Sequence, residues 1–190
     1  MTDVALAVRK ELESARVARR IVCLKREAID AIRVDGFPIA IGPELVLLAA
    51  VGDWQLDGYA IVRLVDITLV RSEEYERFTE RVLEGEGELA RVAPPTPPVP
   101  VDSWLTVFGA LRASGRYVLV HEEEYEDEPM SIGPVVGVRA ESVLVHYVDA
   151  TGEWEEEPSE IPFADITRVQ VEDRYSSVFG RYAEKSRPAV

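Results

Sequence analysis

Residues 52–68 read GDWQLDGYAIVRLVDIT, and residues 152–167 read GEWEEEPSEIPFADIT. Both stretches open on Gly, an acidic residue and Trp, and both close on Asp-Ile-Thr. Self-similarity at a long and nearly fixed spacing indicates a repeated structural unit. The two stretches therefore predict that the chain of 190 residues carries the same module twice.

The similarity continues upstream of these two stretches. Residues 20–24 (RIVCL) line up with residues 116–120 (RYVLV), and residues 46–48 (VLL) line up with residues 143–145 (VLV). The offset between equivalent positions drifts only between 96 and 100 along the chain. Small insertions at turns produce such a drift when the elements themselves are kept. We therefore expect an internal duplication.

A proline-rich segment separates the two halves. Five prolines fall within residues 94–100. Because proline fixes φ and has no N–H to donate, this segment is neither a helix nor an inner strand, and it is typical of an extended spacer. The chain then divides into a first helix-plus-barrel module at 1–83, a proline-rich linker at 84–102, a second such module at 103–183 and a flexible tail at 184–190.

The sequence pattern of each half predicts a helix, five short strands and a final short helix. Apolar residues recur at helical spacing in residues 3–18 and again in residues 103–113. Short runs rich in Val, Ile, Leu and Tyr, bounded by Gly, Pro and acidic turns, predict the strands. These runs are 20–25, 37–41, 45–51, 59–64, 67–71, 116–121, 133–138, 142–148, 159–163 and 166–171. Ser72 and Asp173 are candidate N-caps of the final helices.

Five short strands in about 55 residues are too few for two packed sheets. One strongly bent sheet that closes on itself also removes exposed edges. The predicted fold class is therefore mainly β with flanking helices (α+β), in the form of two tandem five-stranded small barrels from an internal duplication. The two modules are expected to pack as an intramolecular pseudo-dimer, or the chain to form a homo-oligomer.

A family resemblance accompanies this pattern. Residues 62–70 (VRLVDITLV) resemble the second motif of Sm-like proteins, and residues 36–48 and 133–145 are similar to the strand pair of the first motif. The resemblance covers most of each half and implies barrels of the Sm-like or SH3-like type. The chain is also similar to uncharacterised bacterial proteins built from one or two such modules.

The RNA site of Sm-like proteins does not carry over with the motifs. Their first motif has an Asn where this chain has Val46, and where the second half has Ser142 or Val143. Leu64 replaces the Gly that follows Arg in the second motif. The resemblance therefore implies the fold and not the uridine site.

Charge and cysteine content narrow the function classes. The chain has 35 acidic and 21 basic side chains, for a net charge of −14, of which residues 94–190 contribute −10. This balance opposes binding to a phosphate backbone and favours a basic protein partner. A lone cysteine, Cys23, fits a reducing compartment. No secretory signal or spanning segment is visible, so we expect a cytoplasmic protein without membrane contact.

No catalytic or cofactor motif stands out. The sequence contains no P-loop, no GxGxxG fingerprint and no GxSxG elbow. His121, His146 and Cys23 all lie in predicted apolar strands, where a structural role is the simplest interpretation. We therefore expect no enzyme activity, no cofactor and no metal site.

Acidic runs and two tryptophans are the candidate contact residues. Acidic residues cluster in EEEYEDE (122–128) and in EWEEEP (153–158). The acidic runs indicate a solvated turn, a docking surface for a basic partner, or least of all a cation site. Trp54 and Trp154 occupy equivalent turns, and we expect the rings to pack back on the fold in preference to anchoring a partner. The candidate partner-binding residues are Trp54, Trp154, Glu122, Glu123, Glu124, Glu155, Glu156 and Glu157.

These features predict a non-enzymatic protein-interaction module that binds a basic protein through its acidic second half. The alternative is a Sm-like RNA-binding protein, which needs a basic face. The basic cluster available for that role consists of Arg16, Arg19, Arg20, Lys25 and Arg26.

Overall fold

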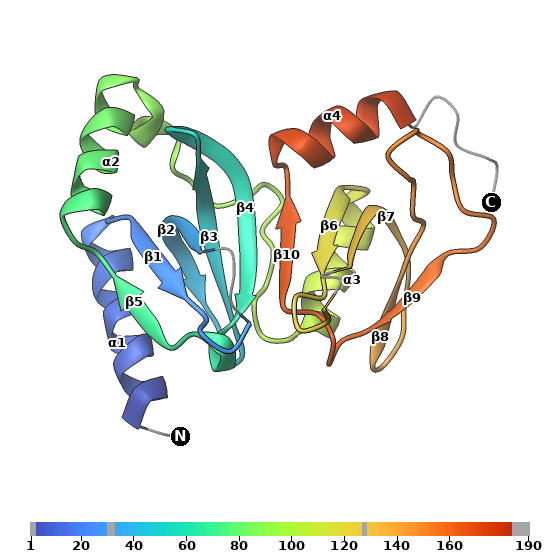
Figure 1. Cartoon of the computed structure of the whole chain (residues 1–190), viewed down its shortest axis with the longest axis horizontal. Helices are drawn as coiled ribbons and strands as arrows, with labels where there is room; N and C mark the ends of the chain where they lie inside the picture. The colour runs from blue at the N-terminus through green and yellow to red at the C-terminus, as the bar shows by residue number, and fades with distance from the viewer. Residues whose placement is uncertain (1–2, 30–32, 127–128, 184–190) are drawn as a thin grey trace.

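Ten antiparallel strands form a single continuous sheet in the computed structural model, which describes residues 3–29, 33–126 and 129–183 (Figure 1). Their order across the sheet is β5-β1-β2-β3-β4-β10-β6-β7-β8-β9. The strands of the first half therefore occupy one side of the sheet and those of the second half the other, with β4 and β10 in contact at the centre.

The elements follow the order that the sequence predicts, with shifted ends. The first half contains α1 (Asp3–Ala18), β1 (Val22–Lys25), β2 (Val34–Ile41), β3 (Leu45–Gly52), β4 (Gln55–Arg63), a 3-10 turn η1 (Leu64–Asp66), β5 (Leu69–Arg71), α2 (Glu74–Gly85) and a second 3-10 turn η2 (Glu88–Arg91). The second half contains α3 (Trp104–Ser114), β6 (Tyr117–His121), β7 (Met130–Val138), β8 (Ser142–Val145), β9 (Ser159–Pro162), β10 (Arg168–Val171) and α4 (Arg174–Ala183).

The prediction of two closed five-stranded barrels is wrong, although the α+β composition is confirmed. The strands form one open sheet, because the strand that would close the second barrel, β10, pairs with β4 of the first half as well as with β6. Val62 lies opposite Arg168, and Ile61 lies opposite Val169. The edges of the sheet are β5 and β9, which end the strand order.

The strands also do not support the predicted internal duplication. β3 and β4 have eight and nine residues, whereas β8 and β9 have four residues each. The two stretches that resemble each other in sequence therefore build different hairpins. The second of them contains only the short strand β9 and a loop of acidic residues.

Close backbone contact holds the central pair of strands together. Gly58 in β4 has a φ of +66°, and a Cβ atom there would lie 2.4 Å from the carbonyl oxygen of Val171. Only glycine combines this left-handed conformation with so close an approach. The N–H of Arg174 donates to the Asp57 carboxylate (2.7 Å), which ties the start of α4 to the same place.

The largest hydrophobic core crosses the boundary between the halves. Leu47 and Ile61 of the first half share one buried cluster with Phe108, Val118 and Val169 of the second. α1 covers a separate part of the core, in which Leu12 is buried against strands of the first half (Figure 1). Because burial of apolar surface is the main favourable term in folding, the shared core couples the stability of the two halves.

The proline-rich segment between the two halves takes part in this core. Pro95, Val99 and Val101 are buried. A Cβ atom at Gly42 would lie 1.8 Å from the carbonyl oxygen of Val101, so the segment runs directly against the β2–β3 turn. Arg116 donates to the carbonyl oxygens of Thr96 and Pro97 in the same segment. The predicted tail at 184–190 lies outside the described residues.

Candidate functional site

Trp54 lies in the tight turn between β3 and β4, with a strained backbone. Asp53 and Trp54 have φ values of +47° and +65°, in the left-handed region that bulky residues rarely enter. The Trp54 side chain is 43% exposed. Strain of this kind persists where the surrounding structure holds it, and it is common at functional sites. The turn therefore presents a large aromatic side chain on the surface at a cost in backbone energy.

Aromatic residues of α2 surround Trp54. The ring centroid of Phe78 lies 5.6 Å from that of Trp54 in an edge-to-face arrangement, and that of Tyr75 lies 6.2 Å away. The guanidinium of Arg33 lies 4.5 Å from the Tyr75 ring centroid and donates to its hydroxyl, and that of Arg81 lies 5.6 Å from the Phe78 ring centroid. We call these five residues the aromatic surface.

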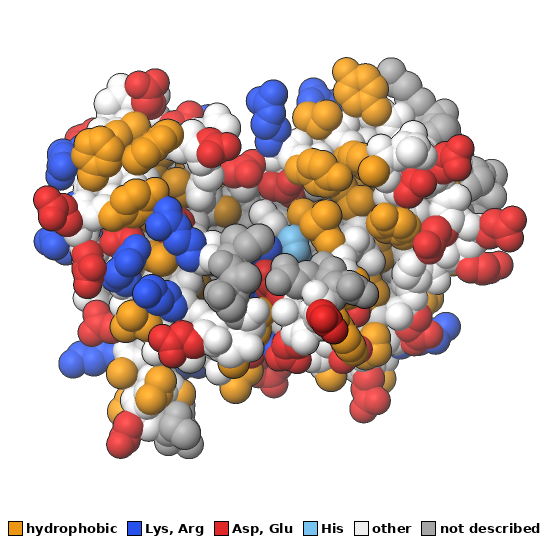
Figure 2. Space-filling model, viewed as in Figure 1, with side chains coloured by type: hydrophobic (Ala, Val, Ile, Leu, Met, Phe, Trp, Pro, Cys, Tyr) orange, Lys and Arg blue, Asp and Glu red, His pale blue; other side chains and the backbone are white. Residues whose placement is uncertain are grey.

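The aromatic surface is open to solvent in the described structure. Tyr75 and Phe78 are exposed to nearly the same degree as Trp54. Figure 2 shows hydrophobic side chains gathered over α2, with basic side chains beside them, and a second hydrophobic group over α4 on the same face. In α4, Tyr175 is exposed and stacks on Phe179 with a centroid distance of 5.5 Å.

Trp154 differs from Trp54, although the sequence places the two in equivalent turns. Its indole N–H donates to the carbonyl oxygen of Ala183 (3.2 Å). Its ring centroid lies 4.8 Å from that of His146 and 6.4 Å from that of Tyr117. Trp154 packs on the fold as expected and holds the end of α4 against the sheet, whereas Trp54 packs on α2 and is still 43% exposed.

The acidic run at 122–124 does not form one surface. Glu123 is buried, with a bidentate pair to Arg26 (2.5 and 3.0 Å) and an ion pair to Arg168 (3.0 Å). Thr167 also donates to its carboxylate (2.6 Å). Glu124 is exposed and pairs with Arg63. The Glu123 side chain is therefore committed inside the protein and is not presented to a partner.

Burial and the two neighbouring guanidinium groups shift the pKa of Glu123 in opposite directions. Burial alone raises the pKa of this carboxyl, but hydrogen bonds from Arg26 and the charge of Arg168 outweigh it and hold the pKa well below the usual range. The pKa of Glu122 is raised by partial burial and by the charge of Asp165. Glu123 is consequently a permanent anion at neutral pH, and it neutralises one of the two buried arginines.

His121 completes the buried cluster. Its Nδ1 lies 3.3 Å from Nη2 of Arg168, and its Nε2 lies 2.8 Å from Oε1 of Gln170. Burial lowers the pKa of His121, and the charge of Arg168 lowers it further, to about 4. The neutral ring therefore accepts a hydrogen bond from Arg168 and donates one to Gln170. We call Arg26, His121, Glu123, Thr167 and Arg168 the junction cluster, because Arg26 comes from the first half and the others from the second.

Glu155, Glu156 and Glu157 remain on the surface. They lie in the loop before β9 and are exposed. The Ser159 hydroxyl donates to the carboxylate of Glu155 (2.9 Å). The backbone oxygen of Glu155 lies 2.9 Å from Nε2 of His146. The acidic loop is thus fixed at its start while its carboxylates face solvent. It is the part of the predicted acidic surface that the fold leaves available.

Cys23 and the two histidines lie in positions that suit structural roles. Cys23 is buried in β1, where burial and the nearby Asp35 carboxylate raise its pKa to about 12. His146 lies under Trp154, and His121 belongs to the junction cluster. Within residues 3–29, 33–126 and 129–183, no three potential metal ligands of the His, Cys, Asp or Glu type come together.

The basic cluster considered for RNA binding is largely occupied. Arg26 is buried against Glu123, Arg16 pairs with Glu13, and Arg19 donates to the carbonyl oxygen of residue 92. Arg20 and Lys25 are exposed. A phosphate backbone would therefore meet a surface on which several cations already have partners.

Comparison with protein families, with curated proteins and with solved structures gives no match to this chain. Among the described residues, the helices are all too short or too polar to cross a membrane.

Proposed function

We propose that the chain is a non-enzymatic interaction protein whose protein partner docks on the aromatic surface. The observation that carries this proposal is the exposed cluster of Trp54, Tyr75 and Phe78 with Arg33 and Arg81 stacked on its rings. Trp, Tyr and Arg are the residues that most often dominate the binding energy of protein interfaces.

The geometry of the cluster supports the same proposal. The Trp54 ring packs against those of Tyr75 and Phe78, so little side-chain freedom is lost when a partner covers them. Arg33 is held by the Tyr75 hydroxyl and by Asp35 (3.1 Å) and is also nearly fixed before binding. A rigid, partly apolar patch with fixed hydrogen-bond donors suits a protein surface that offers apolar side chains and carbonyl or carboxylate oxygens.

Charge sets the long-range part of recognition. The chain carries a net charge of −14, and Glu155, Glu156 and Glu157 are exposed. Such a field speeds the approach of a basic protein and slows that of nucleic acid. The acidic second half therefore contributes to encounter in this proposal, while Glu123, which the sequence grouped with the contact residues, contributes only to stability.

A photo-crosslinking experiment tests the proposal. A benzophenone amino acid in place of Phe78 is irradiated in a native extract, with and without nuclease. We expect a discrete protein adduct that excess unlabelled wild-type protein suppresses and that Trp54→Ala suppresses at least about tenfold less well, since loss of a hot-spot residue typically costs 2 kcal/mol or more. Tyr182→Ala is the matched control, because Tyr182 is an exposed aromatic residue outside the aromatic surface. Equal competition by the wild type and by Trp54→Ala would refute the proposal.

RNA binding is the second outcome of the same experiment. If nuclease removed the adduct, and affinity fell steeply with salt, the chain would be an RNA-binding protein. The partners already taken by Arg16, Arg19 and Arg26 favour the protein outcome.

A further inference from the structure

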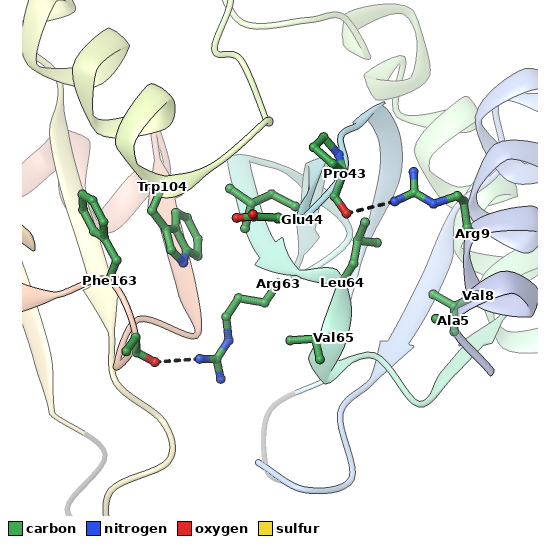
Figure 3. A pocket seen from close by; sticks show the side chains of 12 residues that line it. Ala5, Val8, Arg9, Pro43, Glu44, Arg63, Leu64, Val65, Trp104 and Phe163 are labelled. Atoms are coloured by element: carbon green, nitrogen blue, oxygen red, sulfur yellow. Dashed lines mark hydrogen bonds between the residues drawn. The ribbon is translucent and has the colours of Figure 1, made fainter. Parts of the chain in front are cut away.

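A half-open pocket of about 490 Å³ lies where the two halves meet, at the end of β4 opposite to Trp54 (Figure 3). Residues of α1, of the β2–β3 turn and of η1 form one side, and Trp104 and Phe163 form the other. The volume falls within the range of small-molecule sites. The pocket therefore has the size and the position of a binding site that the aromatic surface does not use.

The walls are mainly apolar. Val8, Leu45, Leu64 and Val65 contribute aliphatic side chains, and Phe163 is fixed by parallel stacking on Phe108 at a centroid distance of 5.8 Å. Val65 is 84% exposed at the rim, where it extends the apolar wall toward solvent. These walls suit an aliphatic chain or a similar apolar body.

Two hydrogen-bond donors on the walls lack the partners they prefer. The indole N–H of Trp104 has no acceptor among the described residues, although Trp104 is only 6% exposed. Arg9 donates only to the carbonyl oxygens of Gly42 (2.9 Å) and Pro43 (3.1 Å) and forms no ion pair with any described residue. A buried donor without an acceptor is costly, and a guanidinium binds a carboxylate more strongly than a neutral carbonyl.

The other charges direct an anion to Arg9. Arg63 already pairs with Asp66 (2.6 Å) and Glu124, and it also donates to the carbonyl oxygen of Ala164. The Glu44 carboxylate is turned toward Trp104 and away from Arg9 in Figure 3. Arg9 is consequently the place on the wall where a negative group gains most.

We infer that the pocket binds a small amphipathic carboxylate, with its apolar chain between Leu64 and Trp104 and its carboxylate on Arg9. Octanoate is the probe, and octanol and octylammonium are isosteric controls that lack the negative charge. Titration of each into the full-length protein, followed by two-dimensional NMR, locates binding through the indole N–H resonance of Trp104 and the amide of Leu64. Calorimetry gives the dissociation constants.

Octanoate is expected to shift both resonances and to bind about tenfold more tightly than octanol, which corresponds to one charge-assisted hydrogen bond. Arg9→Gln should remove this advantage, whereas Lys10→Gln, which deletes a charge from an exposed neighbouring site on α1, should keep it. Val65→Asp gives a second variant at an exposed position; it removes an apolar contact from both probes and adds a negative charge, so it should weaken octanoate more than octanol. The inference is wrong if octanoate fails to bind, shifts resonances elsewhere, binds no better than octanol, or is equally affected by the Arg9 and Lys10 changes.

Discussion

Replacing Glu123 by Gln tests the junction cluster, since it removes a buried charge while keeping the size of the side chain. The carboxylate is 8% exposed and faces two guanidinium groups, and Arg26 has a side-chain exposure of only 2%. The pKa of Glu123 is lowered to about 2, which corresponds to roughly 3 kcal/mol in favour of the charged carboxylate over the neutral acid. Removing one partner of a buried pair typically costs about 3–5 kcal/mol, because the remaining charge is left uncompensated. We therefore expect Glu123→Gln to lower the free energy of unfolding by about 3–5 kcal/mol.

Urea denaturation at pH 7, followed by circular dichroism, measures this change. Glu124→Gln is the matched control, because the neighbouring residue loses the same charge from an exposed ion pair with Arg63. Exposed pairs contribute at most about 1 kcal/mol, so the two variants should differ by at least about 2 kcal/mol. If Glu123→Gln cost no more than Glu124→Gln, the junction cluster would not be a buried ionic network.

Three further predictions concern single residues of the sheet. His121 has a lowered pKa of about 4, so between pH 6.5 and 4 the unfolded chain binds a proton that the folded chain does not, and the free energy of unfolding should fall by up to about 3 kcal/mol as the pH is lowered. The variant His121→Gln should make the urea midpoint less dependent on pH across that window. An unchanged pH dependence would contradict the buried, neutral state of His121. Gly58→Ala combines left-handed backbone strain with contacts of 2.4 Å to the end of β10 and should lower the free energy of unfolding by about 2–4 kcal/mol. Gly87→Ala, also at positive φ but in open space, should lower it by about 1 kcal/mol. Equal shifts in melting temperature would refute the close approach of β4 and β10 at Gly58. Cys23, buried with a pKa of about 12, should react with a thiol reagent at pH 8 only after denaturation, and rapid labelling of the native protein would show that β1 is open.

Local pattern was sufficient to predict most elements of this fold. The strands and helices expected from apolar periodicity and turn residues all occur, with Gly115 ending α3 in the left-handed conformation and Asp173 accepting from the N–H of Ser176 at the start of α4. The elements depend on neighbours in sequence, which is why the sequence reveals them. The cap residues were predicted less well: the N-cap of α2 is Glu73 and not Ser72, and the N-cap of α3 is Ser103, paired with Thr106 in a capping box.

The arrangement of the strands depends on distant contacts and was not predictable in the same way. β4 carries buried residues on both faces, since the consecutive residues Ile61 and Val62 are both buried, and this pattern fits a closed barrel and a continuous sheet equally well. The glycine at 58 was the available signal for close approach of another backbone, but nothing local identifies β10 as its partner. The choice between closing each half and joining the halves is made by long-range packing.

The candidate site shows the same division. Acidic run 122–124 looks uniform in sequence, yet Glu123 is buried and Glu124 is exposed, because the turn after β6 places only Glu123 beside Arg26 and Arg168. Trp54 and Trp154 look equivalent, yet Ala183 is near enough to accept from only one of them. The aromatic surface joins a turn to a helix about twenty residues later, and its signal was the pair Tyr75 and Phe78 on one face of α2.

Hydrogen exchange of the amides in β4 tests the continuous sheet most directly. β4 pairs with β3 on one side and with β10 on the other, so consecutive amides from Ala60 to Val62 should all be strongly protected in native protein at neutral pH. If the two halves were independent open units, β4 would lack β10 and become an edge strand, and every second amide of this segment would exchange rapidly. Uniform slow exchange along β4 is the result we predict, and alternating fast exchange would contradict the joined sheet.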